Sequence, residues 1–284
     1  MIEVKNLHYT YPGQKEPALA GLNFMIPKGE VFGFLGPSGA GKSTTQKILI
    51  GVLKKYLGSV KVMGTEVKDT GPEYFEQIGV AFEFPNFYSK FTAMENLKLF
   101  RSLYSGHTQD PLSLLTQVDL VAAANMKVSQ MSKGMKMRLN FCRALLNDPS
   151  ILFLDEPTSG LDPVNAKRMK DLIMEKKASG TTVLITTHNM QAAEELCDRV
   201  AFIVDGQIKL IDSPRELKLL KGNQRLRLEY RYEGKISQVE FPLEGIGENR
   251  QFLQLIREHP IETIHSLEAS LEQIFIDVTG RTLA

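Results

Sequence analysis

A glycine-rich loop near the N-terminus constrains this chain more than any other stretch. Residues 36–44 have the sequence Gly-Pro-Ser-Gly-Ala-Gly-Lys-Ser-Thr, which fits the phosphate-binding pattern G-x-x-x-x-G-K-[ST]. An apolar run at 31–35 predicts a buried strand before the loop, and apolar residues at helical spacing follow it from Thr44 to Leu53. Strand, glycine loop and helix in this order are the context that the motif requires. The sequence therefore predicts a binding site for a nucleoside triphosphate.

Each residue type in this loop has a physical role in holding phosphate. The glycines let backbone N–H groups turn toward an anion, and the positive end of the helix dipole adds to the attraction. Lys42 is expected to reach the β- and γ-phosphates, and the Ser43 hydroxyl to ligate Mg²⁺. The alternative is a glycine-rich turn with an incidental lysine, which the flanking strand and helix argue against. The residues expected to bind the nucleotide are Gly36, Pro37, Ser38, Gly39, Ala40, Gly41, Lys42, Ser43 and Thr44.

Composition argues against several other classes of protein. The chain has 284 residues and a formal net charge of +1, so no overall field would recruit nucleic acid or an anionic membrane. It contains no uncharged apolar run of about 18 residues, and its first residues predict a strand rather than a signal peptide. The two cysteines, Cys142 and Cys197, lack metal-binding spacing and are expected to be buried small hydrophobes.

Strands and helices are expected to alternate along the first 220 or so residues, which predicts an α/β fold. Strands separated by helices imply a mostly parallel core sheet, whose ligands bind at the carboxyl ends of the strands. The segment 85–147 is mostly helical in pattern and is expected to form a helical subdomain inserted into the sheet domain, beside an antiparallel β subdomain. The expected strands are 2–9, 18–26, 31–35, two short strands within 58–67, 78–82, 151–154 and 181–187.

Three further polar residues stand where expected strands end. Asp155 follows four apolar residues, which suits an aspartate that holds Mg²⁺ through water. Glu156 could orient water for in-line attack on the γ-phosphate, or it could be a solvated strand-end charge. His188 could hydrogen-bond the γ-phosphate or the attacking water, or it could be structural. Because the phosphate loop also follows a strand, we expect all of these groups to meet at one edge of the sheet.

Two residues outside the strand ends are also candidates. Tyr11 lies in a turn and could be a surface aromatic or a platform on which adenine stacks. Asp162 precedes Pro163, which predicts a helix N-cap with proline at the first helical position.

The sequence changes character after residue 213. Residues 239–243 alternate between apolar and polar as in a half-exposed strand, and apolar residues from Leu271 to Val278 recur at helical spacing. We therefore expect a nucleotide-binding domain at 1–221 and a small α+β accessory domain at 222–284. The simplest role of this accessory domain is packing or stabilising a dimer.

In their order along the chain, these motifs resemble the nucleotide-binding subunit of ABC transporters. The resemblance covers about residues 1–220 and is specific, because several motifs occur in family order. The similar segments are Walker A (36–44), Walker B with the catalytic glutamate (151–156), the D-loop (159–162), the switch histidine (His188) and the aromatic A-loop position (Tyr11).

The signature motif departs from the family pattern. Residues 131–135 are Met-Ser-Lys-Gly-Met where the family has Leu-Ser-Gly-Gly-Gln. Ser132 and Gly134 are kept, whereas Lys133 replaces a glycine and Met135 replaces the glutamine. Variants of this kind resemble a bacterial exporter subgroup, so the resemblance does not imply an inactive site.

A second departure lies at the Q-loop, where Glu83 occupies the position of the family's glutamine. The resemblance makes Glu83 a candidate Mg²⁺ ligand together with Ser43 and Asp155. The C-terminal segments 271–275 and 279–281 are similar to the extension of drug- and antibiotic-exporter ATPases.

The resemblance implies an ATP-driven motor that binds ATP and Mg²⁺. Two copies, or one copy and a closely related second ATPase chain, are expected to meet head to tail. Each ATP would then lie between Walker A of one chain and Ser132, Lys133, Gly134 and Met135 of the other. A separate membrane-spanning permease is implied, which would place the chain at the cytoplasmic face of the cell membrane.

Other functions are also possible for such a sequence. A soluble ABC-type ATPase could act on nucleic acid, ribosomes or protein assembly. The single cassette, the unbiased charge and the lack of a long coiled-coil insertion argue against it, so no nucleic acid partner is expected. A module that senses ATP without turnover is a third possibility, against which Glu156 and His188 argue. An importer subunit belongs to the same class as an exporter subunit, and the transported substrate would be chosen by the permease.

Overall fold

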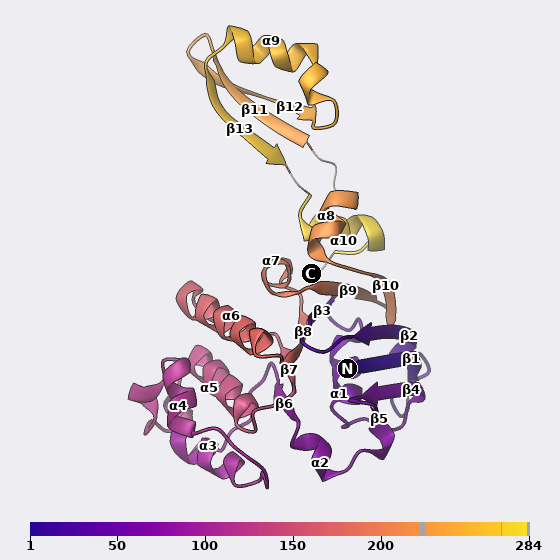
Figure 1. Ribbon diagram of the computed structural model, residues 1–284, viewed down its shortest axis with the longest axis vertical. Helices are drawn as coiled ribbons and strands as arrows, with labels where there is room; N and C mark the ends of the chain where they lie inside the picture. The colour runs from indigo at the N-terminus through magenta and orange to yellow at the C-terminus, as the bar shows by residue number, and fades with distance from the viewer. Residues whose placement is uncertain (222–224, 268, 283–284) are drawn as a thin grey trace. The chain divides into compact units, whose positions relative to one another are not determined.

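The computed structural model describes residues 1–221, 225–267 and 269–282. The chain divides into two compact units, one built mainly from Met1–Ile211 and the other from Asp212–Arg281 (Figure 1). The strands that begin in the first unit are β1 (Ile2–Tyr9), β2 (Leu19–Ile26), β3 (Val31–Leu35), β4 (Leu57–Val62), β5 (Thr65–Glu66), β6 (Ile78–Ala81), β7 (Ile151–Asp155), β8 (Thr182–Thr187), β9 (Arg199–Val204) and β10 (Gln207–Asp212). Its helices are α1 (Lys42–Leu49), α2 (Pro72–Phe75), α3 (Ala93–Arg101), α4 (Pro111–Gln117), α5 (Lys133–Leu145), α6 (Pro163–Ala178) and α7 (Met190–Leu196).

A six-stranded sheet with the order β10-β9-β3-β8-β7-β6 forms the core of the first unit. The neighbours from β9 to β6 are parallel, and every residue of β3 and β8 is buried, as expected for strands covered on both faces. In the register of the sheet, Leu35 pairs with Thr187 and Asp155 pairs with Thr186. The last residues of β3, β7 and β8 therefore lie side by side, so that whatever follows each strand emerges at the same edge.

A four-stranded antiparallel sheet with the order β2-β1-β4-β5 packs on the core sheet. The two sheets share one hydrophobic core. Within it the ring of Phe24 lies 6.0 Å from the ring of Phe32 and 5.2 Å from that of Phe34. This buried aromatic contact connects β2 to β3, the strand that leads into the glycine loop.

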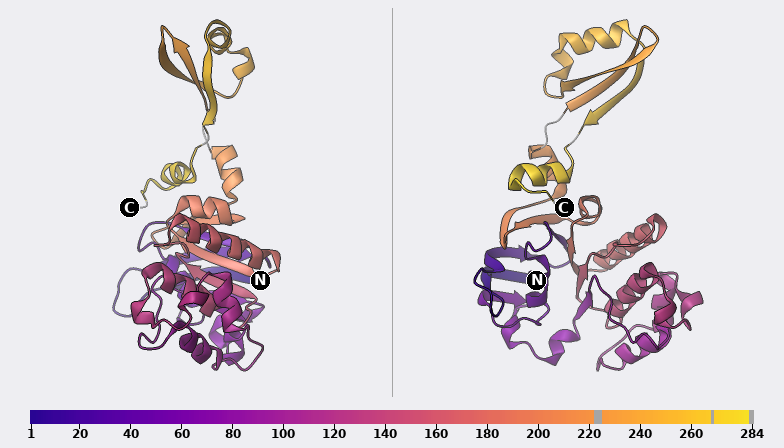
Figure 2. Two further views of the ribbon diagram at one scale, coloured as in Figure 1. Left: turned by 90° about the vertical axis from the view of Figure 1, so that its left-hand side faces the viewer. Right: turned by 180° about the vertical axis from the view of Figure 1, so that it is seen from behind.

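Helices α3, α4 and α5 lie between β6 and β7 in the chain and pack on one another. They occupy the side of the core sheet away from β1, β2 and β4 (Figures 1 and 2). A capping box starts α3, where the Thr92 hydroxyl accepts the Glu95 N–H at 3.1 Å and the Glu95 carboxylate accepts the Thr92 N–H at 2.7 Å. Parallel core sheet, antiparallel sheet and helical insertion together give the α/β fold expected from the sequence.

The second unit contains a three-stranded antiparallel sheet with the order β12-β11-β13. One face of this sheet presents Leu226, Leu228 and Phe241, which pack with Phe252 and Leu255 from a helix. The predicted strand near 239–243 and the predicted C-terminal helix are both present. The elements of this unit are α8 (Pro214–Lys221), β11 (Arg225–Tyr232), β12 (Lys235–Pro242), α9 (Arg250–Glu258), β13 (Ile261–Leu267) and α10 (Leu271–Thr279).

None of the helices in the described part of the chain has the length and apolar character needed to cross a membrane.

Candidate active site

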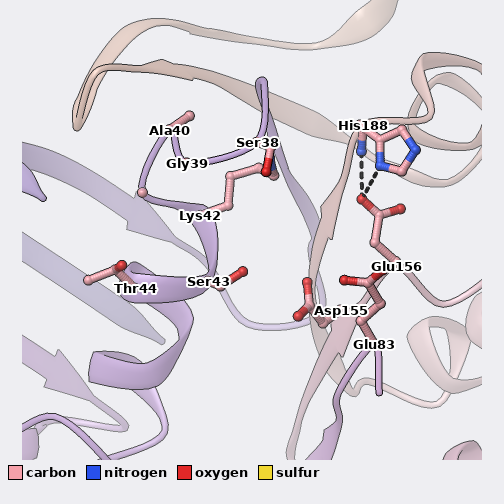
Figure 3. Close-up of a pocket in the computed structure, with 11 residues that line it drawn as sticks. Ser38, Gly39, Ala40, Lys42, Ser43, Thr44, Glu83, Asp155, Glu156 and His188 are labelled. Atoms are coloured by element: carbon pink, nitrogen blue, oxygen red, sulfur yellow. Dashed lines mark hydrogen bonds and ion pairs between the residues drawn. The ribbon is translucent and has the colours of Figure 1, made fainter. Parts of the chain in front are cut away.

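The carboxyl ends of β3, β7 and β8 surround a pocket of about 490 Å³ (Figure 3). The meeting of strand ends that the sequence predicts is therefore observed. The residues that line the pocket are Ser38, Gly39, Ala40, Gly41, Lys42, Ser43 and Thr44 from the loop and the start of α1, Glu83 after β6, Asp155 and Glu156 at the end of β7, and His188 after β8.

The glycines of the loop are required by its backbone and by close contacts. Gly41 has a φ of 109°, in the left-handed region, and precedes α1 as its N-cap. A Cβ on Gly36 would lie 2.1 Å from the carbonyl oxygen of Ile203, which leaves no room for a side chain. Among the described residues no side chain caps α1, so the first N–H groups of this helix keep their capacity to bind an anion. The loop thus fits phosphate by its backbone alone.

Lys42 lies against the inside of the loop. Its Nζ donates to the carbonyl oxygens of Gly36 at 2.6 Å and Pro37 at 2.9 Å. Burial lowers the pKa of Lys42, while the charges of Glu156, Asp155 and Glu83 act in the opposite direction. An anionic ligand would add a favourable charge to this partly buried ammonium group.

Asp155 is held by the neighbouring strand. Its Oδ1 accepts a hydrogen bond from the hydroxyl of Thr186, its partner in the register of β7 and β8. Burial raises the pKa of Asp155, the Thr186 hydrogen bond opposes this shift, and the charge of Glu156 adds to it. A cation in the pocket would therefore be favourable for Asp155.

The arrangement of carboxylates suits Mg²⁺ that is shared with phosphate. Within the described ranges, no group of three or more His, Cys, Asp or Glu side chains is placed to hold a metal by itself. Mg²⁺ usually binds one or two carboxylates and keeps substrate phosphates and waters as its other ligands. Glu83 and Asp155 line the same pocket as Ser43, so the oxygen donors present fit such a site.

Glu156 is fixed by contacts at the end of β8. Its backbone has a φ of 48°, which turns the chain sharply after β7, and the residue is only 8% exposed. One carboxylate oxygen, Oε2, accepts from the Thr187 hydroxyl at 2.8 Å. The other oxygen, Oε1, accepts the backbone N–H of His188 at 2.8 Å and lies 2.6 Å from its Nδ1 (Figure 3). The structure thus joins the two residues in one hydrogen-bonded pair beside the phosphate loop.

Tyr11 lies next to the pocket and is not one of the residues that line it. Its hydroxyl is 3.1 Å from the hydroxyl of Thr44, and its ring makes an edge contact with Tyr9 at 4.9 Å. The ring is therefore anchored beside the start of α1, and its role toward adenine stays a prediction.

The signature residues lie outside the pocket. The Ser132 hydroxyl accepts the Met135 N–H at 3.2 Å and so caps α5. A Cβ on Gly134 would lie 3.4 Å from the carbonyl oxygen of Gly160, and one on Gly160 would lie 3.0 Å from Cε of Lys133. The structure thus places Lys133 and Gly134 against Gly160 of the same chain.

Asp162 forms the predicted N-cap of α6, with proline at the first helical position. Its Oδ1 accepts the N–H groups of Val164 at 3.1 Å and Asn165 at 3.0 Å. The Asn165 side chain also donates to Asp162 and holds the pKa of this carboxyl below its ordinary value.

Sequence reasoning missed the residues that hold the site in place. Thr186 and Thr187 fix the two carboxylates, and the only sequence signal for them is a pair of polar residues at the end of a buried strand. The loop that carries Glu83 is held from α5, where Asn140 donates to Phe82 at 2.7 Å and Arg143 donates to the carbonyl oxygen of Asn86 at 3.1 Å.

A glycine phosphate loop at the end of a parallel strand, with an aspartate and a glutamate at the end of the next strand but one, defines a P-loop nucleoside triphosphatase. The ABC transporter profile matches residues 19–159, and the profile of the fluoroquinolone efflux ABC transporter C-terminal domain matches residues 224–268. The chain is 53% identical, over its whole length and 94% of the other protein, to a fluoroquinolones export ATP-binding protein of Mycobacterium tuberculosis.

Other similar proteins agree with this result. The lantibiotic transport ATP-binding protein SrtF of Streptococcus pyogenes is 36% identical over 80% of this chain and 98% of that protein. The solved structure of a dimeric ATP-binding cassette, in a post-hydrolysis state bound to ADP and Pi, has a TM-score of 0.68 and 30% identity, over 75% of this chain and 98% of that one. The chain therefore belongs to the ABC transporter family, as an ATP-binding and ATP-hydrolysing subunit of the kind found in export systems.

Proposed function

We propose that this chain uses ATP hydrolysis to drive export through a separate membrane-spanning permease, and that it works as a head-to-tail dimer. The observation that carries the proposal is that the phosphate loop, Asp155 and the Glu156–His188 pair line the same pocket. Hydrolysis of a γ-phosphate by a positioned water requires an ammonium group, a metal-binding carboxylate and a restrained carboxylate around the phosphate site.

Each residue in the pocket has a proposed role toward ATP. The loop amides and Lys42 hold the phosphates, and Tyr11 supports the adenine from outside the pocket. Ser43, Asp155 and Glu83 hold Mg²⁺, which neutralises the charge of the β- and γ-phosphates when it is bound. Glu156 takes the proton of the attacking water, and His188 keeps the carboxylate aimed at that water.

The position of Ser132 and Lys133 supports the proposed dimer. Ser132 and Lys133 are exposed at the start of α5 and are outside the pocket that contains their own phosphate loop. A helix start that is free of the chain's own nucleotide can bind the nucleotide of a second chain. We propose that Ser132, Lys133, Gly134 and Met135 do so, in a homodimer or with a closely related ATPase chain.

The proposed cargo and partner rest on the similar proteins. The relative from M. tuberculosis is named for fluoroquinolone export, and its similarity to this chain includes the accessory region matched at 224–268. We therefore propose that the permease exports drugs of the fluoroquinolone class. In this proposal residues 1–221 form the ATPase domain with its helical subdomain at 85–147, and residues 222–284 form an accessory domain. The chain would then work at the cytoplasmic face of the cell membrane.

The test combines hydrolysis, size and drug accumulation. Glu156→Gln should bind MgATP, lose hydrolysis and become dimeric by light scattering at micromolar protein, with a monomer in the absence of nucleotide. Cells that contain the permease and the wild-type chain should accumulate less fluoroquinolone than cells with Glu156→Gln. A monomer at saturating MgATP would contradict the dimer, and equal drug accumulation would contradict the proposed cargo.

A further inference from the structure

A buried glutamine lies behind the metal-binding aspartate. Gln46 is on α1, one turn after Ser43, and is 1% exposed. Its Oε1 is 3.4 Å from the hydroxyl oxygen of Thr186, which is fully buried on β8. The same hydroxyl contacts Oδ1 of Asp155. Three polar side chains from three different elements thus connect the buried interior to the pocket that Asp155 lines.

The number of protons on each group decides which group donates and which accepts in these contacts. A hydroxyl has a single proton, and the ionised, nearer Asp155 is a better acceptor than an amide oxygen. Once Thr186 donates to Asp155, its oxygen can still accept. The Nε2 of Gln46 has no hydrogen-bond partner among the residues that the structure describes.

Because the two ends of a side-chain amide are nearly alike in shape, a half-turn of the Gln46 amide brings its NH₂ group to Thr186. The half-turn gives the buried donor a partner and orders all three groups in one chain of hydrogen bonds.

We propose that Gln46 and Thr186 form a buried relay that fixes the orientation of Asp155 for Mg²⁺, with Gln46 donating to Thr186 and Thr186 donating to Asp155. This rests on the proposed function in one respect, the role of Asp155 toward the metal. Gln46 and Thr186 are therefore residues that position Asp155. The Thr186 contact is made to one carboxylate oxygen, Oδ1.

Two physical arguments favour the relay. Hydrogen bonds in series strengthen one another where the local dielectric is low. A glutamine buried here without such a role would leave the cost of its desolvated amide uncompensated.

The test measures how nucleotide binding depends on Mg²⁺. Binding of a fluorescent ATP analogue to the full chain is titrated with Mg²⁺ and repeated in EDTA. Thr186→Val should raise the Mg²⁺ midpoint roughly tenfold, the loss expected for one hydrogen bond to a charged group, and leave binding in EDTA unchanged. Thr186→Ser keeps the hydroxyl and should restore the wild-type midpoint.

Thr182→Val is the matched control. Thr182 is a fully buried threonine on the same strand, and its hydroxyl accepts the Gly29 N–H at 2.9 Å, away from the pocket residues. It should lower the unfolding temperature as Thr186→Val does and leave the Mg²⁺ midpoint unchanged. If Thr186→Val also leaves the midpoint unchanged while it lowers the unfolding temperature, the residue is only structural and the relay is wrong.

A double-mutant cycle tests the glutamine. Gln46→Leu should raise the Mg²⁺ midpoint about threefold, because it acts on Asp155 only through Thr186, and should add nothing further in the Thr186→Val background. Full additivity of the two changes would overturn the relay at Gln46. Loss of analogue binding by the wild-type chain, or hydrolysis by Glu156→Gln, would instead contradict the proposed function, so the two failures are distinguishable.

Discussion

The imidazole Nδ1 of His188 lies 2.6 Å from Oε1 of Glu156, and the backbone N–H of His188 donates to the same oxygen at 2.8 Å. The histidine side chain is 63% exposed, whereas that of the glutamate is 10% exposed. The pair therefore connects a buried carboxylate to a group at the surface of the pocket. A group that binds at the exposed imidazole therefore lies one hydrogen bond from the buried carboxylate.

Glu156→Gln should retain MgATP binding and lose about 10²–10⁴-fold in turnover, because the amide cannot take a proton from water. Phosphate release and binding of a fluorescent nucleotide measure the two effects. Lys42→Ala is the matched comparison and should lose binding. Hydrolysis by Glu156→Gln at the wild-type rate would show that another group is the base.

Gly36→Ala should destabilise the chain more than Gly39→Ala. The new Cβ at residue 36 would overlap the carbonyl of Ile203 at 2.1 Å, so the backbone must shift. At residue 39, where φ is 79°, nothing lies within 4 Å of the new Cβ, and only the left-handed conformation costs roughly 1–2 kcal/mol. Thermal unfolding without nucleotide compares the two variants, and an equal loss of stability would argue against the close contact.

Asp155→Asn should raise the stability of the nucleotide-free chain at neutral pH. Burial raises the pKa of Asp155 in the folded state, so the protonated side chain favours folding. The free energy of unfolding therefore falls as the pH rises from the pKa of Asp155 in the unfolded chain to its pKa in the folded chain. The asparagine oxygen can still accept from Thr186. The gain should therefore disappear at pH values below the ordinary pKa of aspartate. Unfolding temperatures across this pH range give the result, and a variant that is less stable at pH 7 would contradict it.

Lys133→Gly should weaken ATP-driven dimerisation and slightly stabilise the isolated subunit. The positive charge of a lysine in the first turn of α5 destabilises the helix by a few tenths to about 1 kcal/mol, because it lies at the positive end of the helix dipole. A nucleotide phosphate held by the partner chain would offset this cost. Glycine also has a lower helix propensity, so Lys133→Ala serves as the control without that loss. Sedimentation with Glu156→Gln as background measures the dimer. Unchanged dimerisation in both variants would leave Lys133 a solvated side chain.

Glu83→Ala should reduce the permease-stimulated ATPase rate more than the basal rate of the isolated subunit. The loop after Glu83 is tied to α5 by the Arg143 hydrogen bond to Asn86, so it can carry movement between the pocket and the helical insertion. Mg²⁺ prefers a charged oxygen ligand, and the glutamate repels the γ-phosphate before the metal is bound. Glu83→Gln should restore most of the coupling. The basal and the permease-stimulated ATPase rates are measured at low and at saturating Mg²⁺. Equal rates in wild type and Glu83→Ala would refute the role of Glu83 in coupling.

Most of the first unit could be predicted because its signals are local. The apolar run before the glycine loop and the four apolar residues before Asp155 each predict a buried strand, and the parallel arrangement then brings their ends together. The contact of Asp155 with Thr186 could not be predicted in this way. It joins residues 31 positions apart and depends on the register of two strands, which the sequence pattern does not specify.

The second unit was less predictable for a different reason. In β11 leucine alternates with arginine, and this strand forms the centre of a sheet with one face packed and the other polar. Arg227 and Glu240 pair across β11 and β12, so each charge is compensated by a neighbour that is distant in the sequence. The alternation of β11 is itself a signal for a half-buried strand, which sequence reasoning missed, whereas the pairing of its charges depends on the partner strands.

The backbone of Glu156 also bears on efforts to make this chain more heat-resistant. An L-residue in the left-handed region at a φ of 48° costs roughly 1–2 kcal/mol, and glycine would release that cost. Glu156→Gly would also remove the carboxylate that accepts from the Thr187 hydroxyl and the His188 N–H, and the loss of an acceptor for a buried donor costs about 1–3 kcal/mol. The strained glutamate is therefore retained by the fold as well as by the site, so glycine replacement at positive φ, a common route to heat resistance, does not apply at this position.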